Sequence, residues 1–421
     1  MTAAAHPAAF QMANPHALAS IMEASETRKI IASQDIFDIA GTKLWASHQP
    51  VSASLQRKLL DRQLRNPLET CLMAEDGVTP SALARTTQAM LDDNNPLALL
   101  VRPHTPRIVM EAAHLPLQPV AQLLLTTAQA ARPASYAHAV QAMALAGTLM
   151  LEHGGTIAEV RLAMLGGLLH DVGEMYIDPR HGEADAERSL DFTSYQQLVV
   201  HPHVGSLLIG QLTNYPAALA RAVAEHHERL DGSGYPHALH RAGISPLGRL
   251  LAVTETACAV LRGDAPFLAR VSVALRVVPG EFDLSWVARI GDAARAQPAL
   301  HGTLSLHEVQ ARLTRLDGAL QGAHDATCGL AARAESPALK GALALAQHLL
   351  GRLRTGWNAS GLWSPEALAD SDAAEVEAVE DELYYRLRGI ERATRLRAGA
   401  LVSAEAEQLN LLCADLGVVP D

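Results

Sequence analysis

The chain has 421 residues, of which 49% are hydrophobic and 4% are aromatic, and its formal net charge is −11. This hydrophobic content is enough for two or three buried cores and excludes a largely disordered chain. The negative charge excludes a protein that coats polymeric nucleic acid, because binding many phosphates requires an excess of Lys and Arg.

The cysteines and the apolar stretches indicate the cellular compartment in which the protein is expected. Cys71, Cys258, Cys328 and Cys413 lie far apart and form no CxxC pair, which argues against a disulfide framework and a thiolate zinc site. The N-terminus lacks the basic start and apolar run of a secretory signal. The uncharged stretch 112–131 contains two prolines and several polar residues, so it is not a spanning helix. We therefore expect a cytoplasmic protein without a membrane span.

The first part of the chain predicts a small α+β module. Residues 1–27 form an N-terminal tail that is either loose or a short helix. Within residues 28–95, β-prone runs broken at Ala40-Gly41 predict a hairpin, and residues 66–77 contain a further strand. A helix is expected after Ser52, and another begins at Thr79-Pro80. We interpret residues 28–95 as a regulatory module.

The rest of the chain has helical periodicity. Residues 97–295 are helical except for the polar stretch 177–192 and the glycine-rich stretch 224–236. Residues 296–421 contain amphipathic runs and form a helical C-terminal extension. The predicted fold class is mainly α, with an antiparallel helical bundle between the small α+β module and the extension.

Histidines and acids recur along the helical runs of residues 97–295. They are His138, His170, Asp171, His201, His226, His227 and Glu255. Each alone is explained as a polar group at a helix end. The steps between them, however, each have room for one helix and a return, so an antiparallel bundle can bring them to one point. Imidazole together with carboxylate suits Fe, Mn or Zn better than Ca or Mg.

The strings HDVGE, HPHVG and HHERLDGSGYP follow one another in this region, and together they resemble the HD-GYP family of bacterial cyclic dinucleotide phosphodiesterases. The resemblance covers about residues 120–295 and implies an HD-type helical bundle. It also implies two divalent metal ions, Fe or Mn first and Zn, Ni or Co as alternatives. The implied activity is hydrolysis of cyclic di-GMP to a linear product through a metal-bridging hydroxide.

The resemblance assigns roles to individual residues. One metal would be held by His138, His170 and Asp171, and a second by Asp171, His201, His226 and His227, with Glu255 in the position of the family's last ligand. Asp171 and Glu174 take the catalytic positions. The implied substrate-binding residues are Gly234, Tyr235, Pro236 and Arg249, with the Tyr235 ring available for stacking on a guanine. Without the preceding HHE, the glycine-rich stretch is explained as a plain turn.

Several positions depart from the family pattern. Glu174 stands where the family has Lys, and an ionised carboxylate there would repel substrate by roughly 1 to 4 kcal/mol. Arg229, Arg241 and Arg249 are candidates to replace the missing positive charge. Cys258 stands where the family has a second Asp. Ala134 stands where trinuclear members have Glu, so at most two metals are expected.

These departures leave two alternatives open. A catalytically degenerate HD-GYP protein would bind cyclic di-GMP or a partner, such as a GGDEF-type signalling protein docking on the GYP loop. A hydrolase of the wider HD superfamily would act on another nucleotide, although the GYP string argues against it. A homodimer is compatible with either reading, whereas polymeric nucleic acid is excluded as a partner.

Overall fold

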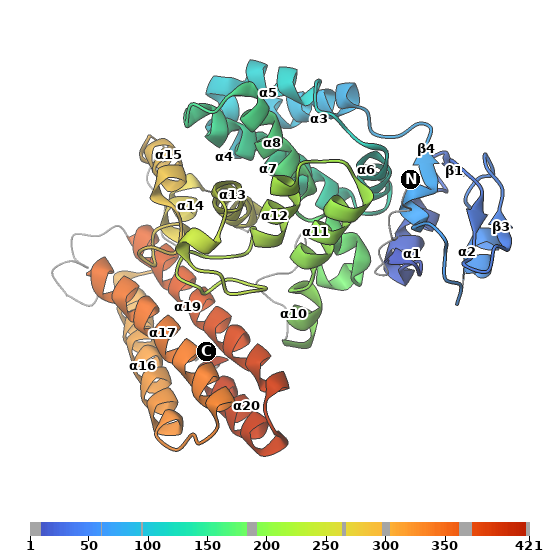
Figure 1. Ribbon diagram of the computed structural model, residues 1–421. Coiled ribbons are helices and arrows are strands. Elements are labelled where there is room, and N and C mark those ends of the chain that lie inside the picture. Colours follow the sequence, from blue (N-terminus) through green and yellow to red (C-terminus); the bar gives the residue numbers. More distant parts are fainter. Residues whose placement is uncertain are drawn as a thin grey trace. The chain divides into compact units, whose positions relative to one another are not determined.

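The computed structural model describes residues 10–59, 61–93, 96–182, 192–262, 267–296, 304–361 and 373–417. The chain divides into two compact units. Unit 1 contains the chain up to His227 together with Ser245–Cys258, and unit 2 contains Glu228–Ile244 and the chain from Ala259 onward. Helices make up most of the regular structure in both units (Figure 1), which confirms the predicted mainly helical fold.

Unit 1 begins with a small α+β module, which we call the N-terminal module (residues 10–78). Its elements are α1 Pro15–Ala24, β1 Ile30–Ala32, β2 Ile36–Phe37, β3 Lys43–Trp45, α2 Ala53–Leu59, the 3-10 turn η2 Leu68–Thr70 and β4 Leu72–Ala74. Strands β2 and β3 form the predicted antiparallel hairpin, and β1 pairs antiparallel with β4. Of the two alternatives for the tail, a short helix is present at residues 15–24.

The core of the N-terminal module explains why this helix forms. Leu18 and Ile21 of α1 pack in one cluster with Ile30 of β1, Leu55 of α2 and Leu72 of β4. The Asn14 side chain caps α1 by accepting hydrogen bonds from the backbone of the first turn. The apolar face of the helix and its cap therefore make residues 15–24 part of this core.

The remainder of unit 1 is helical. Its elements are α3 Pro80–Asp92, α4 Pro96–Val101, η3 Arg102–His104, α5 Thr105–Ala112, α6 Pro119–Ala131, α7 Pro133–Glu152, α8 Ile157–Leu169, η4 Val172–Tyr176, η5 Pro179–His181, α10 Phe192–Leu198, α11 His201–Leu212, α12 Ala217–Glu225 and most of α13 Pro246–Arg262. Thr79 caps α3 with its side chain, as its position before Pro80 predicts. Helices α7 and α8 can pack closely because Gly167 has no side chain: a Cβ there would lie 2.4 Å from the Ala142 carbonyl oxygen.

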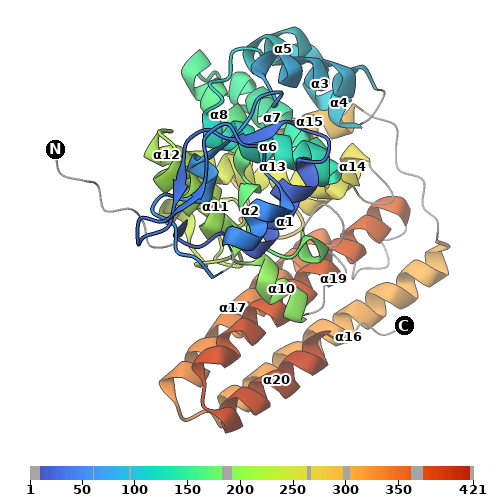
Figure 2. The same cartoon turned by 90° about the vertical axis from the view of Figure 1, so that its right-hand side faces the viewer.

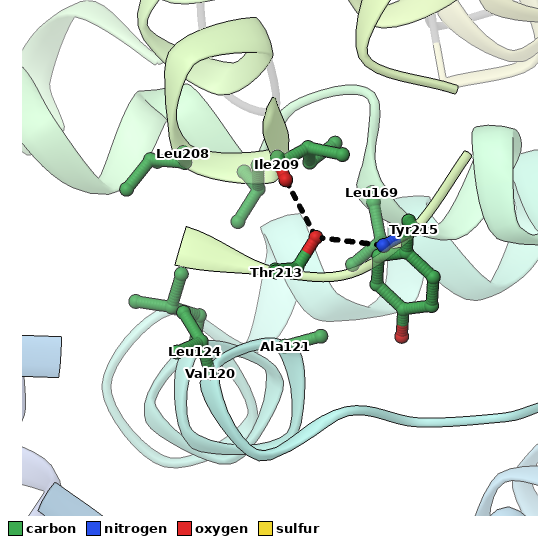
Figure 3. Close-up of a pocket in the computed structure, with 9 residues that line it drawn as sticks. Val120, Ala121, Leu124, Leu169, Leu208, Ile209, Thr213 and Tyr215 are labelled. Carbon is green, nitrogen blue, oxygen red and sulfur yellow. Dashed lines mark hydrogen bonds between the residues drawn. The ribbon is translucent and has the colours of Figure 1, made fainter. Parts of the chain in front are cut away.

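A small apolar pocket lies beside the α8–η4 junction. Leu169 and Val172 line it together with residues of α6 and with Leu208, Ile209, Thr213 and Tyr215. The Thr213 hydroxyl donates to the Ile209 carbonyl oxygen at 2.6 Å and accepts from the Tyr215 amide at 3.3 Å (Figure 3). The pocket therefore marks the joint between α6, α11 and the segment that carries His170 and Asp171.

Unit 2 is dominated by the C-terminal helices. Its elements are η6 Arg241–Gly243, α14 Leu268–Ala274, α15 Leu284–Arg295, α16 Leu306–Ala331, α17 Pro337–Ser360, α19 Ala373–Arg395, η7 Leu396–Ala400 and α20 Ser403–Gly417. Helices α16, α17, α19 and α20 lie side by side around a leucine-rich core that includes Trp357 (Figures 1 and 2). The helical C-terminal extension is thereby confirmed. Among the helices in the described ranges, none combines the length and the hydrophobicity that crossing a bilayer requires.

Candidate metal centre

Unit 1 brings together all seven residues that the sequence singles out as metal ligands. Three histidines lie at helix ends, as the sequence predicts: His170 caps the end of α8, His201 begins α11 and His226 caps the end of α12. Adjacent residues on a helix point about 100° apart, so Asp171 and His227 can join their neighbours only because the helices stop there. His138 differs from the expectation, because it lies in the second turn of α7 and not at a helix end.

The first group of side chains contains His138, His170, Asp171 and Glu255. The Glu255 Oε2 atom lies 2.7 Å from His138 Nε2 and 3.0 Å from His170 Nε2. Asp171 Oδ2 lies 3.2 Å and 3.1 Å from the same two nitrogens. The four ligand atoms all lie within 4.8 Å of one another, which is close enough for one cation to contact them together.

The second group contains Asp171, His201, His226 and His227. Asp171 Oδ1 lies 3.4 Å from the Nε2 atoms of both His201 and His226. The two Nε2 atoms are 3.1 Å apart, and all four residues offer a ligand atom within the same 4.8 Å limit. Asp171 thus belongs to both groups and directs one carboxylate oxygen toward each.

Backbone carbonyl groups orient three of the imidazole rings. Each ring places Nδ1 against the carbonyl oxygen of the residue three positions earlier: 2.7 Å for His170 and Gly167, 2.8 Å for His201 and Leu198, and 2.6 Å for His226 and Val223. A carbonyl oxygen can only accept a hydrogen bond, so Nδ1 carries the proton. In the neutral ring the lone pair is then on Nε2, the nitrogen that faces the cluster.

This proton placement makes the cluster a good fit for cations. The Nε2 atoms of His138 and His170 are 3.0 Å apart, and those of His201 and His226 are 3.1 Å apart. Two bare nitrogen lone pairs at this separation repel each other unless a proton or a cation lies between them. Asp171 Oδ1 is also buried without a hydrogen-bond partner in the described part of the chain. Metal-ligating histidines commonly have the Nδ1 bonding seen here.

Burial and mutual charge also shift the pKa values of the cluster. Burial disfavours the charged form of His170, but Asp171 and Glu255 outweigh burial and raise its pKa well above the ordinary value. Burial opposes ionisation of Asp171, yet the surrounding imidazoles, His170 first, hold its pKa well below the ordinary range. Burial lowers the pKa of His226 to about 4. Asp171 is therefore an anion in a ring of imidazoles, as a bridging ligand requires.

Two residues that sequence reasoning missed hold the surrounding backbone. Glu225 accepts hydrogen bonds from the Ser245 amide at 2.8 Å and from Arg221 Nε at 2.7 Å, which fixes the start of α13, the helix of Glu255. Gly173 lies against α11, where an added Cβ would come 2.0 Å from the His201 carbonyl oxygen. Glu225 directly precedes the HHE string and Gly173 closely follows HD, so their positions in the sequence were a signal of a role near the site. Their contact partners could not be predicted from the sequence.

Glu174 is buried, with 3% of its surface exposed. Burial opposes protonation of His201, but Asp171 outweighs it and raises the pKa of His201. The negative charge of Glu174 adds to this rise. The Arg132 guanidinium donates a hydrogen bond to the Glu174 carbonyl oxygen at 2.7 Å. Arg132 is thus a positive group beside Glu174, and it was not among the three arginines considered from the sequence.

The predicted substrate-binding residues lie in both units. Arg249 is a half-buried residue of α13 in unit 1, whereas Gly234, Tyr235 and Pro236 belong to unit 2. Their contacts with a substrate remain predictions.

Side-chain hydrogen bonds shape the turn that contains Gly234, Tyr235 and Pro236. The buried Glu228 carboxylate accepts from the amides of His237 at 2.7 Å and Leu239 at 2.8 Å. Asp231 accepts from the Ser233 amide at 3.0 Å. These bonds give the glycine-rich stretch a defined backbone.

Comparisons with known proteins match the part of the chain that carries this centre. Residues 122–277 match the family model described as HD domain. A cyclic di-GMP phosphodiesterase of Pseudomonas aeruginosa is 28% identical over 220 residues, which are 52% of this chain and 50% of that protein. The 3'3'-cGAMP-specific phosphodiesterase 1 of Vibrio cholerae is 25% identical over 36% of this chain and 35% of that protein.

Two further similarities extend the comparison. The cyclic di-GMP phosphodiesterase response regulator RpfG of Xanthomonas campestris is 30% identical over 28% of this chain and 31% of that protein. The chain thus spans half or less of the length of these curated relatives. A solved HDG"Y"P protein from Bdellovibrio bacteriovorus is 15% identical, with a TM-score of 0.37 and coverage of 65% of this chain and 98% of that one.

Proposed function

Because the chain is a member of the HD-GYP family, with an HD domain over residues 122–277, we propose that it is a metal-dependent phosphodiesterase that hydrolyses cyclic di-GMP to a linear product. The observation that carries this proposal is the sharing of Asp171 between two groups of four ligand side chains. Relatives named as cyclic di-GMP phosphodiesterases support the substrate. One relative is named as specific for 3'3'-cGAMP, so the choice of cyclic dinucleotide is part of what the experiment tests.

The donor set supports two divalent cations. His138, His170 and Glu255 would hold one, His201, His226 and His227 the other, and Asp171 would bridge them. Imidazole and carboxylate ligands suit Fe or Mn, with Zn, Ni and Co as alternatives. When bound, such a pair of ions activates water and offsets the charge of a phosphodiester. The residues of this chain contribute orientation, because the carbonyl oxygens of Gly167, Leu198 and Val223 hold three of the rings in place.

Other residues would act on the substrate. Tyr235 would stack on a guanine base, and the backbone at Gly234 and Pro236 would allow close approach of the nucleotide. Arg249 would pair with a phosphate. Glu174 would act beside the scissile phosphate, either by accepting a proton or by orienting water, and Arg132 would limit the charge repulsion that its carboxylate causes.

The buried acid at position 174 favours a second candidate function, a catalytically degenerate protein that binds cyclic di-GMP or a protein partner without hydrolysis. Glu174 is buried in place of the family's Lys, so repulsion of substrate is not screened by water. A GGDEF-type partner belongs to this alternative, whereas a homodimer is compatible with either function. Light scattering of the pure protein and of a mixture with a GGDEF domain would test them.

Turnover and binding by metal-loaded protein separate these candidates. The protein is loaded anaerobically with Fe or Mn, its metal content is measured, and cyclic di-GMP, 3'3'-cGAMP and a cyclic mononucleotide are offered in turn. We expect a linear dinucleotide or mononucleotide product from a cyclic dinucleotide, and Asp171→Asn to abolish it. Two bound ions with binding of cyclic di-GMP but no turnover of any substrate would refute hydrolysis and favour the degenerate protein. Turnover of the mononucleotide alone would refute both.

A further inference from the structure

The five-residue turn η4, Val172–Tyr176, directly follows the shared ligand Asp171. At its start the Glu174 amide donates to the Asp171 carbonyl oxygen at 2.9 Å, and at its end the Ile177 amide donates to the Glu174 carbonyl oxygen at 3.2 Å. A turn of this length has little stability of its own. Its position therefore depends on the groups packed around it.

The N-terminal module supplies several of those groups. The Tyr176 hydroxyl donates a hydrogen bond to the Glu69 carboxylate of η2, and both side chains are buried. The Asn14 side-chain amide donates to the Tyr176 carbonyl oxygen at 3.1 Å. The Phe10 ring packs edge-to-face on the Tyr176 ring, with centroids 5.9 Å apart. Tyr176 is thus held by three residues that lie outside the 122–277 family match.

Arg132 makes a second link between the module and the turn. Its Nη1 donates to the Glu174 carbonyl oxygen at 2.7 Å, and its Nη2 donates to the buried Ser20 hydroxyl of α1 at 3.1 Å. Because one guanidinium joins α1 to η4, the module and the turn share a hydrogen-bond network. A shift of α1 would therefore act on the backbone at Glu174 through Arg132.

The η4 turn also adjoins two of the ligand residues, Asp171 of both groups and His201 of the second group. Asp171 is joined to it covalently. At Gly173, an added Cβ would come 2.0 Å from the His201 carbonyl oxygen and 2.7 Å from the Gly205 amide, so the turn lies directly on the first turn of α11. A displacement of η4 would therefore move Asp171 and also press on the backbone of His201.

We propose, building on the metal centre of the proposed function, that Glu69 and Tyr176 are positioning residues through which the N-terminal module sets the metal affinity of the site. The module acts on the metal centre through η4 and touches no ligand itself in the contacts described above. A role limited to folding would lower stability when the pair is removed and leave the metal dissociation constant unchanged. Metal affinity is therefore the readout that separates positioning from stabilisation.

The test uses the full chain and Mn²⁺ as the probe. Tyr176→Phe keeps the ring on Phe10 and removes only the hydroxyl, and Glu69→Leu removes the acceptor. We expect each to raise the Mn²⁺ dissociation constant, by at most the roughly 10-fold to 100-fold seen when a direct outer-shell partner of a metal ligand is removed, because this pair acts on the ligands through η4. Glu69→Gln retains an oxygen that accepts from Tyr176, so it should stay within about 2-fold of the wild type, and the double variant Glu69→Leu/Tyr176→Phe should be no worse than the single variants.

Arg28→Met is the matched control. Arg28 also joins the N-terminal module to the helical region, through a 2.7 Å hydrogen bond to Gln129 of α6, and within the described ranges its side chain makes no hydrogen bond to η4. We expect its Mn²⁺ affinity to equal that of the wild type. Circular dichroism and thermal melting select the folded variants for titration calorimetry.

The metal affinities decide the inference whether or not the wild type hydrolyses a cyclic dinucleotide. Folded Tyr176→Phe with wild-type Mn²⁺ affinity would overturn it. So would an equal loss of affinity in Arg28→Met, because module docking in general, and not this pair, would then be responsible. Absence of turnover in a wild type that binds two ions refutes only the proposed hydrolysis.

Discussion

Replacing Glu255 with Gln is expected to remove one of the two metal ions and leave the other. Glu255 belongs to the first ligand group, where its Oε2 lies 2.7 Å from His138 Nε2 and 3.0 Å from His170 Nε2. The second group has Asp171 as its carboxylate and does not include Glu255. Gln preserves the size of the side chain and one carbonyl oxygen, so the change is confined to the loss of a negative charge.

The size of the effect follows from the burial of this carboxylate. Glu255 is 2% exposed, so water screens its charge weakly. A carboxylate and a divalent cation about 4 Å apart attract each other by about 8 kcal/mol at an effective dielectric constant of about 20. The remaining amide oxygen and the avoided cost of burying a carboxylate return about half of this or more. A net loss of about 2 to 4 kcal/mol corresponds to a metal dissociation constant roughly 30-fold to 1000-fold higher at the first group. The second group loses only longer-range attraction.

Equilibrium dialysis against Mn²⁺ followed by elemental analysis measures this directly. The wild type should retain two ions per chain, and Glu255→Gln should retain one at the same free Mn²⁺ concentration. Glu111→Gln is the control, because Glu111 is equally buried in unit 1 but pairs with Arg107 and Arg161, at 3.0 Å and 2.7 Å. Two ions held by Glu255→Gln with wild-type affinity would show that Glu255 is not a ligand.

Three further predictions concern stability, each measured by denaturant unfolding. Gly173→Ala should destabilise unit 1 by roughly 3 kcal/mol, because its Cβ meets backbone at 2.0 Å. Gly210→Ala, exposed on α11, should be neutral or stabilising by up to about 1 kcal/mol, and equal effects of the two would refute the clash. Burial raises the pKa of Glu69, so the stability from its protonated form is present below about pH 4.3 and is lost as the pH rises through the folded pKa. Glu69→Gln should therefore gain stability relative to the wild type as the pH rises above about 4.3, and a constant difference would contradict the raised pKa. In unit 2, Arg386→Met should cost roughly 3 to 5 kcal/mol because it removes the 2.9 Å partner of buried Glu281, whereas the double replacement with Glu281→Leu should recover part of the loss. Additive losses would refute this pairing.

Local signals in the sequence predicted much of the fold. Thr79 before Pro80 marks the start of α3, and the break at Ala40-Gly41 marks the β2–β3 hairpin, because caps and turns depend on a few neighbouring residues. The ligand set was predictable for a different reason: imidazole and carboxylate pairs recur at intervals that suit a helical bundle. Their meeting in unit 1 matches that expectation, while their role as ligands remains a prediction.

The parts that could not be predicted depend on partners distant in the sequence. Glu69 and Tyr176 are 107 residues apart, and either alone is explained as an ordinary polar residue. Arg132 reaches Ser20 across 112 residues, so its place beside Glu174 had no local signal. The string HHERLDGSGYP also gave no sign that it passes from unit 1 to unit 2 after His227, because the division depends on tertiary contacts.

The Nδ1 bonds of His170, His201 and His226 also bear on how this centre can be altered. Their acceptors are main-chain oxygens, which no side-chain replacement removes. His138 differs, because its Nδ1 has no hydrogen-bond partner within the described ranges. Efforts to change the metal preference should therefore begin at His138 and at the two carboxylates, where the geometry is set by side chains and can be redesigned without rebuilding the backbone.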